Sequence, residues 1–307
     1  MIARRMTRLR LRGQVLDLGS RPLLMGIVNA APDSFSDGGD YQTLQARVAQ
    51  GAALLEAGAE LLDVGGESAR GDTPAVRAQE EIERVAPLVT RLTELGALVS
   101  VDTYKPAVAA AAIEAGAVLV NDTSGLRDPA VADLCARSGA GLVVMHTRVQ
   151  PKGTLLDPAG YDDVAADVEG FLRERVALAL AHGVDAEQLV LDPGPDFAKT
   201  PAQTVAVLQR LGDLHELGRP LLLAASNKDF VGALTGRGPR ERGAGTLAAL
   251  AHGVDAGAQV LRVHDVAAAA DFLAVRAALR GEREVGRVEG LTPDRWPNGP
   301  PPGLSLG

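Results

Sequence analysis

Short apolar segments that each end in polar residues recur along this chain and constrain its fold more than any other feature. Two of them lie late in the sequence, as 221-LLLAASNKDF-230 and 259-QVLRVHDV-266. In each, an apolar run typical of a buried parallel strand stops abruptly at polar residues. A strand, a polar tip and then a helix form the unit by which α/β enzymes place chemistry at the carboxyl ends of their strands.

Eight such strand candidates alternate with stretches of helical periodicity. They are 23-LLMGIV-28, 60-ELLDVG-65, 97-ALVSVD-102, 117-AVLVND-122, 141-GLVVMH-146, 188-QLVLDP-193, 220-PLLLAAS-226 and 259-QVLRVH-264. This alternation predicts an α/β fold of the (β/α)8, or TIM barrel, type. An open doubly wound sheet is the alternative, and the lack of a Gly-rich dinucleotide-binding turn after the first strand counts against it.

Further segments flank the predicted barrel. Alternating apolar residues within 1–20 predict a short N-terminal β-hairpin. Residues 286–307 are rich in Pro and Gly and have little to bury, so we expect a disordered C-terminal tail. Residues 1–285 then form a single barrel domain.

Composition excludes several classes of protein. The net charge of −8 argues against a general nucleic-acid binder, and no apolar run approaches the length of a membrane span. The N-terminal segment lacks the pattern of a secretory signal. Cys135 is the single cysteine, which excludes an intrachain disulfide and fits a reducing compartment. We therefore expect a cytoplasmic protein with neither a nucleic-acid nor a membrane partner.

Twelve polar residues lie at or beside the predicted strand ends, and a barrel would bring them to one face. They are Asn29, Asp63, Glu67, Asp102, Asn121, Asp122, His146, Asp192, Ser226, Lys228, Arg262 and His264. A single carboxylate at a strand end is often only the N-cap of the next helix. So many polar groups on one face need partners, which predicts a binding site there.

The chemistry of these tips suggests a substrate with a polar ring. Asp102, Asn121 and Asp192 offer carboxylate and amide groups that can together bind the edge of an amino-pyrimidinone ring. Lys228 lies on the seventh predicted strand and could cover the ring or bind an anion.

A second group of tips suggests that the substrate carries an anion. Arg262 and His264 come from the last predicted strand and Asn29 from the first, and these strands become neighbours when a barrel closes. An Arg fork beside a His and an amide suits a pyrophosphate, bound with Mg²⁺.

Several blocks of the sequence resemble dihydropteroate synthase. They are 25-MGIVNAAPDSFSDGG-39, 63-DVGGESAR-70, 100-SVDTYKP-106, 121-NDTSG-125, 145-MH-146, 192-DPGPDFAKT-200, 226-SNK-228 and 262-RVHD-265. They follow the order of that family and cover residues 22–280. The resemblance implies a TIM barrel that condenses 6-hydroxymethyl-7,8-dihydropterin pyrophosphate with p-aminobenzoate, giving 7,8-dihydropteroate and pyrophosphate.

The resemblance also implies roles for particular residues. The candidate catalytic residues are Asp102, Lys228, Asp33 and Arg70. The candidate substrate-binding residues are Asp102, Asn121, Asp192, Lys228, Arg262, His264, Phe197, Met145, Ala69 and Arg70. Asn29 is the candidate Mg²⁺ ligand, and the loops that carry Asp33, Phe35 and Arg70 would close over p-aminobenzoate.

The chain departs from the family pattern near the expected p-aminobenzoate pocket. Ala69, Asp196, Asn227 and Asp229 stand where the family commonly has Thr, Gly, Arg and Ser. An added carboxylate at Asp229 would weaken the binding of a carboxylate substrate unless its side chain turns away.

Alternatives to a synthase follow from these departures. A paralogue that binds a pterin without turning over p-aminobenzoate is the main one, and a methyl-folate-binding methyltransferase is another. The pyrophosphate group of Asn29, Arg262 and His264 favours the synthase over both. The family's dimers imply a homodimer, through late helices such as 241–258.

Overall fold

A computed structural model describes residues 7–19, 21–30, 43–68, 73–153 and 156–285. The predicted tail, residues 286–307, lies outside the described residues. None of the described helices is long and apolar enough to cross a membrane.

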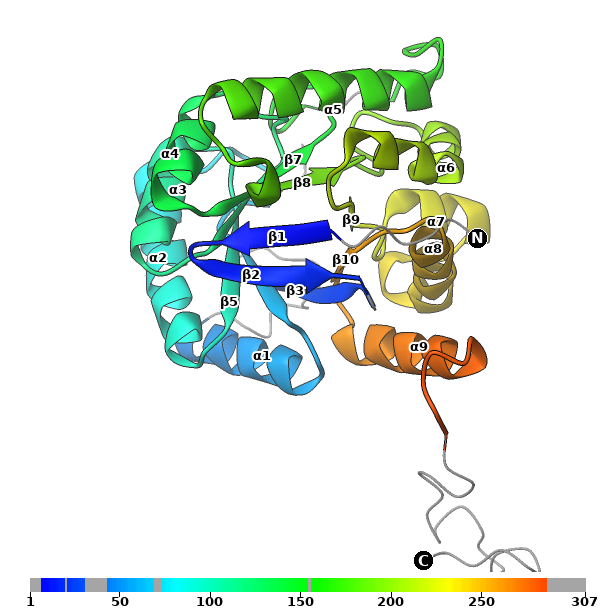
Figure 1. The fold of residues 1–307 in the computed structure, drawn as a ribbon, viewed down its shortest axis with the longest axis horizontal. Helices are drawn as coiled ribbons and strands as arrows, with labels where there is room; N and C mark the ends of the chain where they lie inside the picture. The colour runs from blue at the N-terminus through cyan, green and yellow to red at the C-terminus, as the bar shows by residue number, and fades with distance from the viewer. Residues whose placement is uncertain (1–6, 20, 31–42, 69–72, 154–155, 286–307) are drawn as a thin grey trace, which may run out of the picture.

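Strands and helices alternate along the described chain (Figure 1). The strands are β1 Thr7–Leu11, β2 Gln14–Leu18, β3 Leu23–Asn29, β4 Leu61–Gly65, β5 Leu98–Asp102, β6 Leu119–Asp122, β7 Gly141–Met145, β8 Leu189–Asp192, β9 Leu222–Leu223 and β10 Val260–Val263. The α-helices are α1 Leu44–Glu56, α2 Ala78–Glu94, α3 Pro106–Glu114, α4 Ala130–Ser138, α5 Val164–Ala181, α6 Pro201–Gln209, α7 Asp229–Thr235, α8 Gly243–Asp255 and α9 Val266–Leu279. Short 3-10 helices are η1 Ala186–Gln188, η2 Leu211–Leu217 and η3 Pro239–Glu241.

The sheet confirms the predicted barrel. Eight parallel strands follow the order β8-β7-β6-β5-β4-β3-β10-β9, and the isolated parallel bridge Leu191↔Leu221 joins the two ends. The eight predicted strands correspond to β3–β10, although β9 keeps only two residues of the predicted 220–226. Helices surround the strands on the outside (Figure 1). The predicted N-terminal hairpin is also present, with β1 antiparallel to β2.

Local sequence signals explain where several helices begin and end. Asp163 and Asp265 cap α5 and α9, because their side chains accept hydrogen bonds from backbone N–H groups of the first turn. Gly58 and Gly116 follow α1 and α3 with φ of +104° and +116°, a conformation that favours glycine. The chain can therefore turn from each helix directly into the next strand.

The hairpin closes the amino-terminal end of the barrel, which we call the floor. Leu9, Leu11 and Leu18 are buried against an apolar layer inside the barrel that includes Met25 and Leu119. In Figure 1 the hairpin lies across the centre of the ring of helices. A second, larger core fills the space between the strands and the surrounding helices. The floor is thus sealed, which leaves the carboxyl ends of the strands as the accessible end.

Candidate functional site

Most of the predicted site residues meet at the carboxyl-terminal end of the barrel, which we call the rim. β5 ends at Asp102, β6 contains Asn121, and β8 ends at Asp192. Arg262 lies in β10 and Lys228 follows β9. Because parallel strands end on the same side of a barrel, these side chains are brought together although they are far apart in the sequence.

Arg262 is fixed at the rim by two carboxylates. Its Nε donates to Asp63 Oδ2 at 2.6 Å and its Nη2 to Asp102 Oδ2 at 2.9 Å. Burial lowers the pKa of Arg262, but the carboxylates raise it by more. Burial raises the pKa of Asp102 to about 7, opposed by the charge of Arg262 and assisted by that of Asp63. A buried carboxyl group that titrates near neutral pH is a frequent feature of enzyme sites.

Asp192, Lys228 and Phe197 form the next part of the rim. Asp192 Oδ1 accepts a hydrogen bond from Gly194 N at 2.7 Å. Burial raises the pKa of Asp192, whereas the Gly194 N–H group and the charge of Lys228 lower it. Lys228 Nζ lies 4.3 Å from the centroid of the Phe197 ring. Burial also lowers the pKa of Lys228. Charged groups shielded from water in this way interact strongly with a polar ligand.

His264 and Asn29 lie at the ends of neighbouring strands. The pairing of β10 with β3 confirms that the last and first barrel strands are adjacent. Ser226 Oγ lies 2.9 Å from His264 Nδ1 and accepts a hydrogen bond from the backbone N–H group of His264 at 3.2 Å. Ser226 therefore fixes the imidazole beside the strand end.

The donor set at this end fits a metal ion that arrives with its substrate. Within the described ranges, no group of three or more His, Cys, Asp or Glu side chains is arranged to hold a metal. Asn29 ends β3 and offers a carboxamide oxygen, a hard donor that suits Mg²⁺. Mg²⁺ commonly takes its other ligands from water and substrate phosphates, so a single protein donor is compatible with it.

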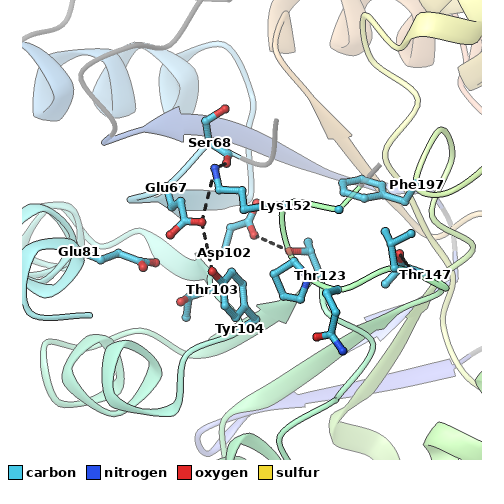
Figure 2. A pocket seen from close by; sticks show the side chains of 14 residues that line it. Glu67, Ser68, Glu81, Asp102, Thr103, Tyr104, Thr123, Thr147, Lys152 and Phe197 are labelled. Carbon is cyan, nitrogen blue, oxygen red and sulfur yellow. Dashed lines mark hydrogen bonds and ion pairs between the residues drawn. The ribbon is translucent and has the colours of Figure 1, made fainter. Parts of the chain in front are cut away.

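Figure 2 shows a small pocket beside these residues, lined by Glu67, Asp102, Lys152 and Phe197 among others and organised around Glu67. Glu67 accepts hydrogen bonds from Val76 N at 3.0 Å and Tyr104 Oη at 3.2 Å, and it pairs with Lys105 and Lys152. Burial raises the pKa of Glu67, but its bonds to Lys105 and Val76 lower it by more. Glu67 therefore ties the loop after β4 to residues that follow β5 and β7.

Lys199 holds the loop that carries Phe197. Its side chain is buried, and its Nζ donates to the carbonyl oxygens of Gly194 at 2.9 Å and Phe197 at 3.1 Å. Nζ also lies 2.7 Å from His146 Nδ1. Burial lowers the pKa of Lys199 to about 7. Burial also lowers the pKa of His146, to about 2, and the charge of Lys199 contributes to this shift. The imidazole of His146 is thus neutral. His146 directly follows Met145, the buried last residue of β7.

The altered position Asp229 turns toward a partner outside the rim. Its Oδ1 accepts a hydrogen bond from Arg242 Nη1 at 2.8 Å, and the same nitrogen donates to the carbonyl oxygen of Asn227 at 2.8 Å. The guanidinium lies against Gly232, where a Cβ would come within 2.4 Å of it. The Asp229 side chain is 86 % exposed. The carboxylate thus turns toward solvent, and Arg242 balances its charge.

Some predicted site residues are not part of this geometry. Asp33, Phe35, Ala69 and Arg70 lie outside the described residues, in the loops after β3 and β4.

The structure also adds residues to which the sequence assigned no role in the site. Asp63 is one of the twelve predicted strand-end residues, but no individual role was predicted for it, and the structure pairs it with Arg262 and Asn121. Lys199 and Arg242 carry no local signal, because their side-chain partners lie outside any local pattern: His146 is 53 residues from Lys199, and Asp229 is 13 residues from Arg242.

Comparisons with known proteins give the family. The family model described as "Pterin binding enzyme" matches residues 25–264. The dihydropteroate synthase of Synechocystis sp. is 40% identical over 271 residues, which cover 87% of this chain and 93% of that protein.

Two solved structures are similar in fold and sequence. Xanthomonas albilineans dihydropteroate synthase with 4-aminobenzoic acid has a TM-score of 0.81 and 45% identity, covering 89% of this chain and 99% of that one. The same enzyme in complex with 7,8-dihydropteroate has a TM-score of 0.78 and 44% identity, covering 88% and 98%. With the blocks of sequence that meet at the rim, these likenesses show that the chain belongs to the dihydropteroate synthase family of pterin-binding enzymes.

Proposed function

We propose that the protein condenses 6-hydroxymethyl-7,8-dihydropterin pyrophosphate with p-aminobenzoate, giving 7,8-dihydropteroate and pyrophosphate. The observation that carries this proposal is the meeting, at one barrel rim, of a ring-binding set of side chains with the fixed guanidinium of Arg262. The solved relatives hold 4-aminobenzoic acid and 7,8-dihydropteroate. These molecules are the second substrate and the product of the proposed reaction.

The pterin ring is assigned to the polar groups of β5, β6 and β8. Asp102, Asn121 and Asp192 supply carboxylate and amide groups that match the donors and acceptors of an amino-pyrimidinone edge. Lys228 lies beside them, and Met145 offers an apolar contact at the end of β7. Binding in this poorly solvated place makes each correct hydrogen bond selective.

The pyrophosphate is assigned to Arg262, His264 and Asn29. Arg262 supplies a charged fork and His264 an imidazole that Ser226 holds in place. Asn29 is the candidate Mg²⁺ ligand. When bound, Mg²⁺ would supply further neutralisation of the pyrophosphate charge.

In the proposed reaction, the bond between the pterin methylene carbon and the pyrophosphate oxygen breaks, and the amine nitrogen of p-aminobenzoate bonds to that carbon and loses a proton. Arg262 and His264 stabilise the negative charge on the leaving group. Asp102 and Asp192 stabilise the positive charge that develops on the pterin. The chemistry needs positioned charges more than a strong base.

The second substrate is assigned to the space near Phe197 and Lys228. The Phe197 ring lies beside the Lys228 amine, which gives an apolar face and a positive charge for an aromatic carboxylate. Asp33, Ala69 and Arg70 belong to the loops that would close over this space, and their part in it is a proposal from the family pattern.

The test is release of pyrophosphate by the purified protein from dihydropterin pyrophosphate and Mg²⁺, with and without p-aminobenzoate. We expect release that depends on p-aminobenzoate, together with formation of dihydropteroate. Tight pterin binding without this release would instead support the paralogue that binds a pterin without turning over p-aminobenzoate. An Asp192→Asn variant should weaken pterin binding, because it removes a charge from the pterin set while it leaves the Arg262 contacts with Asp63 and Asp102 unchanged.

We also propose a homodimer formed through α8 and α9. A surface groove between these helices is lined by Leu247, Phe272 and Val275, and Leu279 beside them is 84% exposed. An apolar groove of this kind is typical of an interface. Light scattering should give twice the mass of the chain, and Leu279→Asp should lower it toward that of one chain.

A cytoplasmic location is part of the same proposal. Cys135 is buried in α4, and burial raises the pKa of its thiol to about 12. This unreactive thiol fits a compartment in which proteins do not depend on disulfides. Cell fractionation tests the location.

A further inference from the structure

A buried carboxylate lies beneath the rim, in the middle of β4. Asp63 has no exposed surface. Its neighbours Leu62 and Val64 belong to the core between the strands and the helices, so Asp63 faces the inside of the barrel. An ionised carboxylate in such a place is costly unless it is paired. The partners of Asp63 therefore indicate why the chain carries it.

Asp63 joins two strands that do not touch each other. In the sheet, β4 lies two strands from β6 on one side and two strands from β10 on the other. Asp63 Oδ2 accepts a hydrogen bond from Asn121 Nδ2 of β6 at 3.1 Å and one from Arg262 Nε of β10 at 2.6 Å. A single oxygen thus holds one side chain from each half of the rim.

These contacts decide which atoms the two side chains present to a substrate. A carboxylate only accepts hydrogen bonds, so Asp63 binds the NH₂ end of the Asn121 amide and leaves Oδ1 to face other groups. Among the described residues, Asn121 Oδ1 has no hydrogen-bond partner. With Nε on Asp63 and Nη2 on Asp102, the plane of the Arg262 guanidinium is fixed as well.

We propose that Asp63 is a positioning residue, which orients the Asn121 amide oxygen toward N–H donors of the pterin and the Arg262 guanidinium toward the leaving pyrophosphate. The proposal rests on the proposed function for the identity of the substrate. It assigns to Asp63 no contact with the reacting atoms.

Ser100 provides a matched control for Asp63. It lies directly opposite Asp63 in the register of β4 and β5 and is equally buried. Within the described part of the chain, its Oγ has no hydrogen-bond partner. Ser100→Ala therefore removes a buried polar group from the same layer of the barrel without disturbing Arg262 or Asn121.

The experiment compares Asp63→Asn, Ser100→Ala, Arg262→Lys and the double variant Asp63→Asn/Arg262→Lys. Pyrophosphate release gives kcat and KM, calorimetry gives the affinity for dihydropterin pyrophosphate, and thermal unfolding reports stability. We expect Asp63→Asn to lower kcat/KM about 10- to 100-fold, since the carboxylate charge that strengthens the hydrogen bond from Arg262 is lost. Ser100→Ala should stay within about twofold of wild type. The loss from Asp63→Asn should be much smaller in the Arg262→Lys background, because the lysine lacks Nε and its fork.

Equal losses from Asp63→Asn in both backgrounds would overturn the proposed positioning of Arg262, because they would mean that Asp63 acts independently of that guanidinium. A lower melting temperature with an unchanged kcat/KM would overturn it too. If Asp63→Asn does not fold, Asp63→Glu keeps the charge but displaces it by one methylene, and wild-type kcat/KM in that variant would contradict the proposal. A wild-type protein that releases no pyrophosphate would refute the proposed function, while the calorimetric affinities of the same variants would still test Asp63.

Discussion

The two ends of the barrel are built from opposite kinds of residue. At the floor, Leu9, Leu11 and Leu18 of the hairpin pack on an apolar layer that fills the inside of the barrel. The strands β5 and β10 contribute Leu98 and Val260 to this apolar layer. A few residues further along the same two strands, Asp102 and Arg262 stand at the rim. These two strands thus change from apolar at the floor to charged at the rim.

The rim carries a cost that the floor does not. Several buried polar atoms of the described chain lack a hydrogen-bond partner, among them atoms of Asp63, Asn121, Asp122 and His146 at or just beneath the rim. Natural proteins keep such atoms mainly where function requires them. The floor thus supplies stability to the barrel, and the rim uses part of it.

The largest effect on the rim is expected from a substitution of Arg262. Arg262→Ala should lower the affinity for dihydropterin pyrophosphate by at least about 100-fold, because Asp63 and Asp102 would be left facing the substrate anion without the guanidinium. Calorimetry measures the effect. The control ligand is 6-hydroxymethyl-7,8-dihydropterin without pyrophosphate, whose affinity should fall less. Unchanged affinity for the pyrophosphate would refute this placement.

A substitution in the floor should have the opposite profile. Leu11→Ala should lower the free energy of unfolding by about 3 kcal/mol, because it leaves a cavity under the barrel. The kcat/KM of the folded enzyme should change by less than about twofold. Denaturant unfolding and the release assay measure the two quantities. Val15→Ala, on the exposed face of the hairpin, is the control and should alter neither.

The third test follows stability against pH at Asp102. Burial raises the pKa of Asp102 from 3.8 to about 7. Between pH 3.8 and about 7, the folded state therefore keeps a proton on Asp102 that the unfolded state has lost. That contribution to stability is present at low pH and is lost as the pH rises through about 7. Asp102→Asn should therefore be the more stable protein above pH 7, by on the order of 2 kcal/mol, with no such gain below pH 4. Thermal unfolding from pH 4 to 8 checks this, and a gain that did not depend on pH would contradict it.

The smallest effect is expected at the edge of the rim. Arg242→Ala should raise the KM for p-aminobenzoate up to about fivefold, because it leaves the Asp229 charge unbalanced and loosens the Asn227 carbonyl. Adding Asp229→Ala should return KM toward the wild-type value. Arg240→Ala, an exposed arginine on η3, is the control. An Asp229→Ala variant that alone lowered KM severalfold would show that Arg242 does not balance the charge.

Most of the fold could be predicted from the sequence because strand and helix periodicities are local. The strand ends follow from where apolar runs stop, and this is why Asp102, Asn121, Asp192 and Arg262 could be chosen as candidates. The extent of β9 could not be predicted, since an apolar run does not reveal where the ladder of hydrogen bonds ends.

The partners of the site residues were beyond local patterns. Arg262 and Asp63 are 199 residues apart, and their contact depends on the closure of the whole barrel. Asp229 drew attention as a departure from the family pattern, but the Arg242 that balances it lies between η3 and α8, directly before Gly243. Periodicity shows that a side chain faces the inside of a barrel, but not which charge it will meet there.

The ring of eight strands has one join with fewer hydrogen bonds than the others. Between β8 and β9 the single bridge Leu191↔Leu221 closes the ring. Asp192 ends the strand on one side of this seam, and Lys228 follows the strand on the other. A pterin bound by both Asp192 and Lys228 would link β8 to β9 across this single bridge. Hydrogen exchange at the amides of Leu191 and Leu222 should then slow when substrate binds, because the ligand stabilises the closed barrel between β8 and β9.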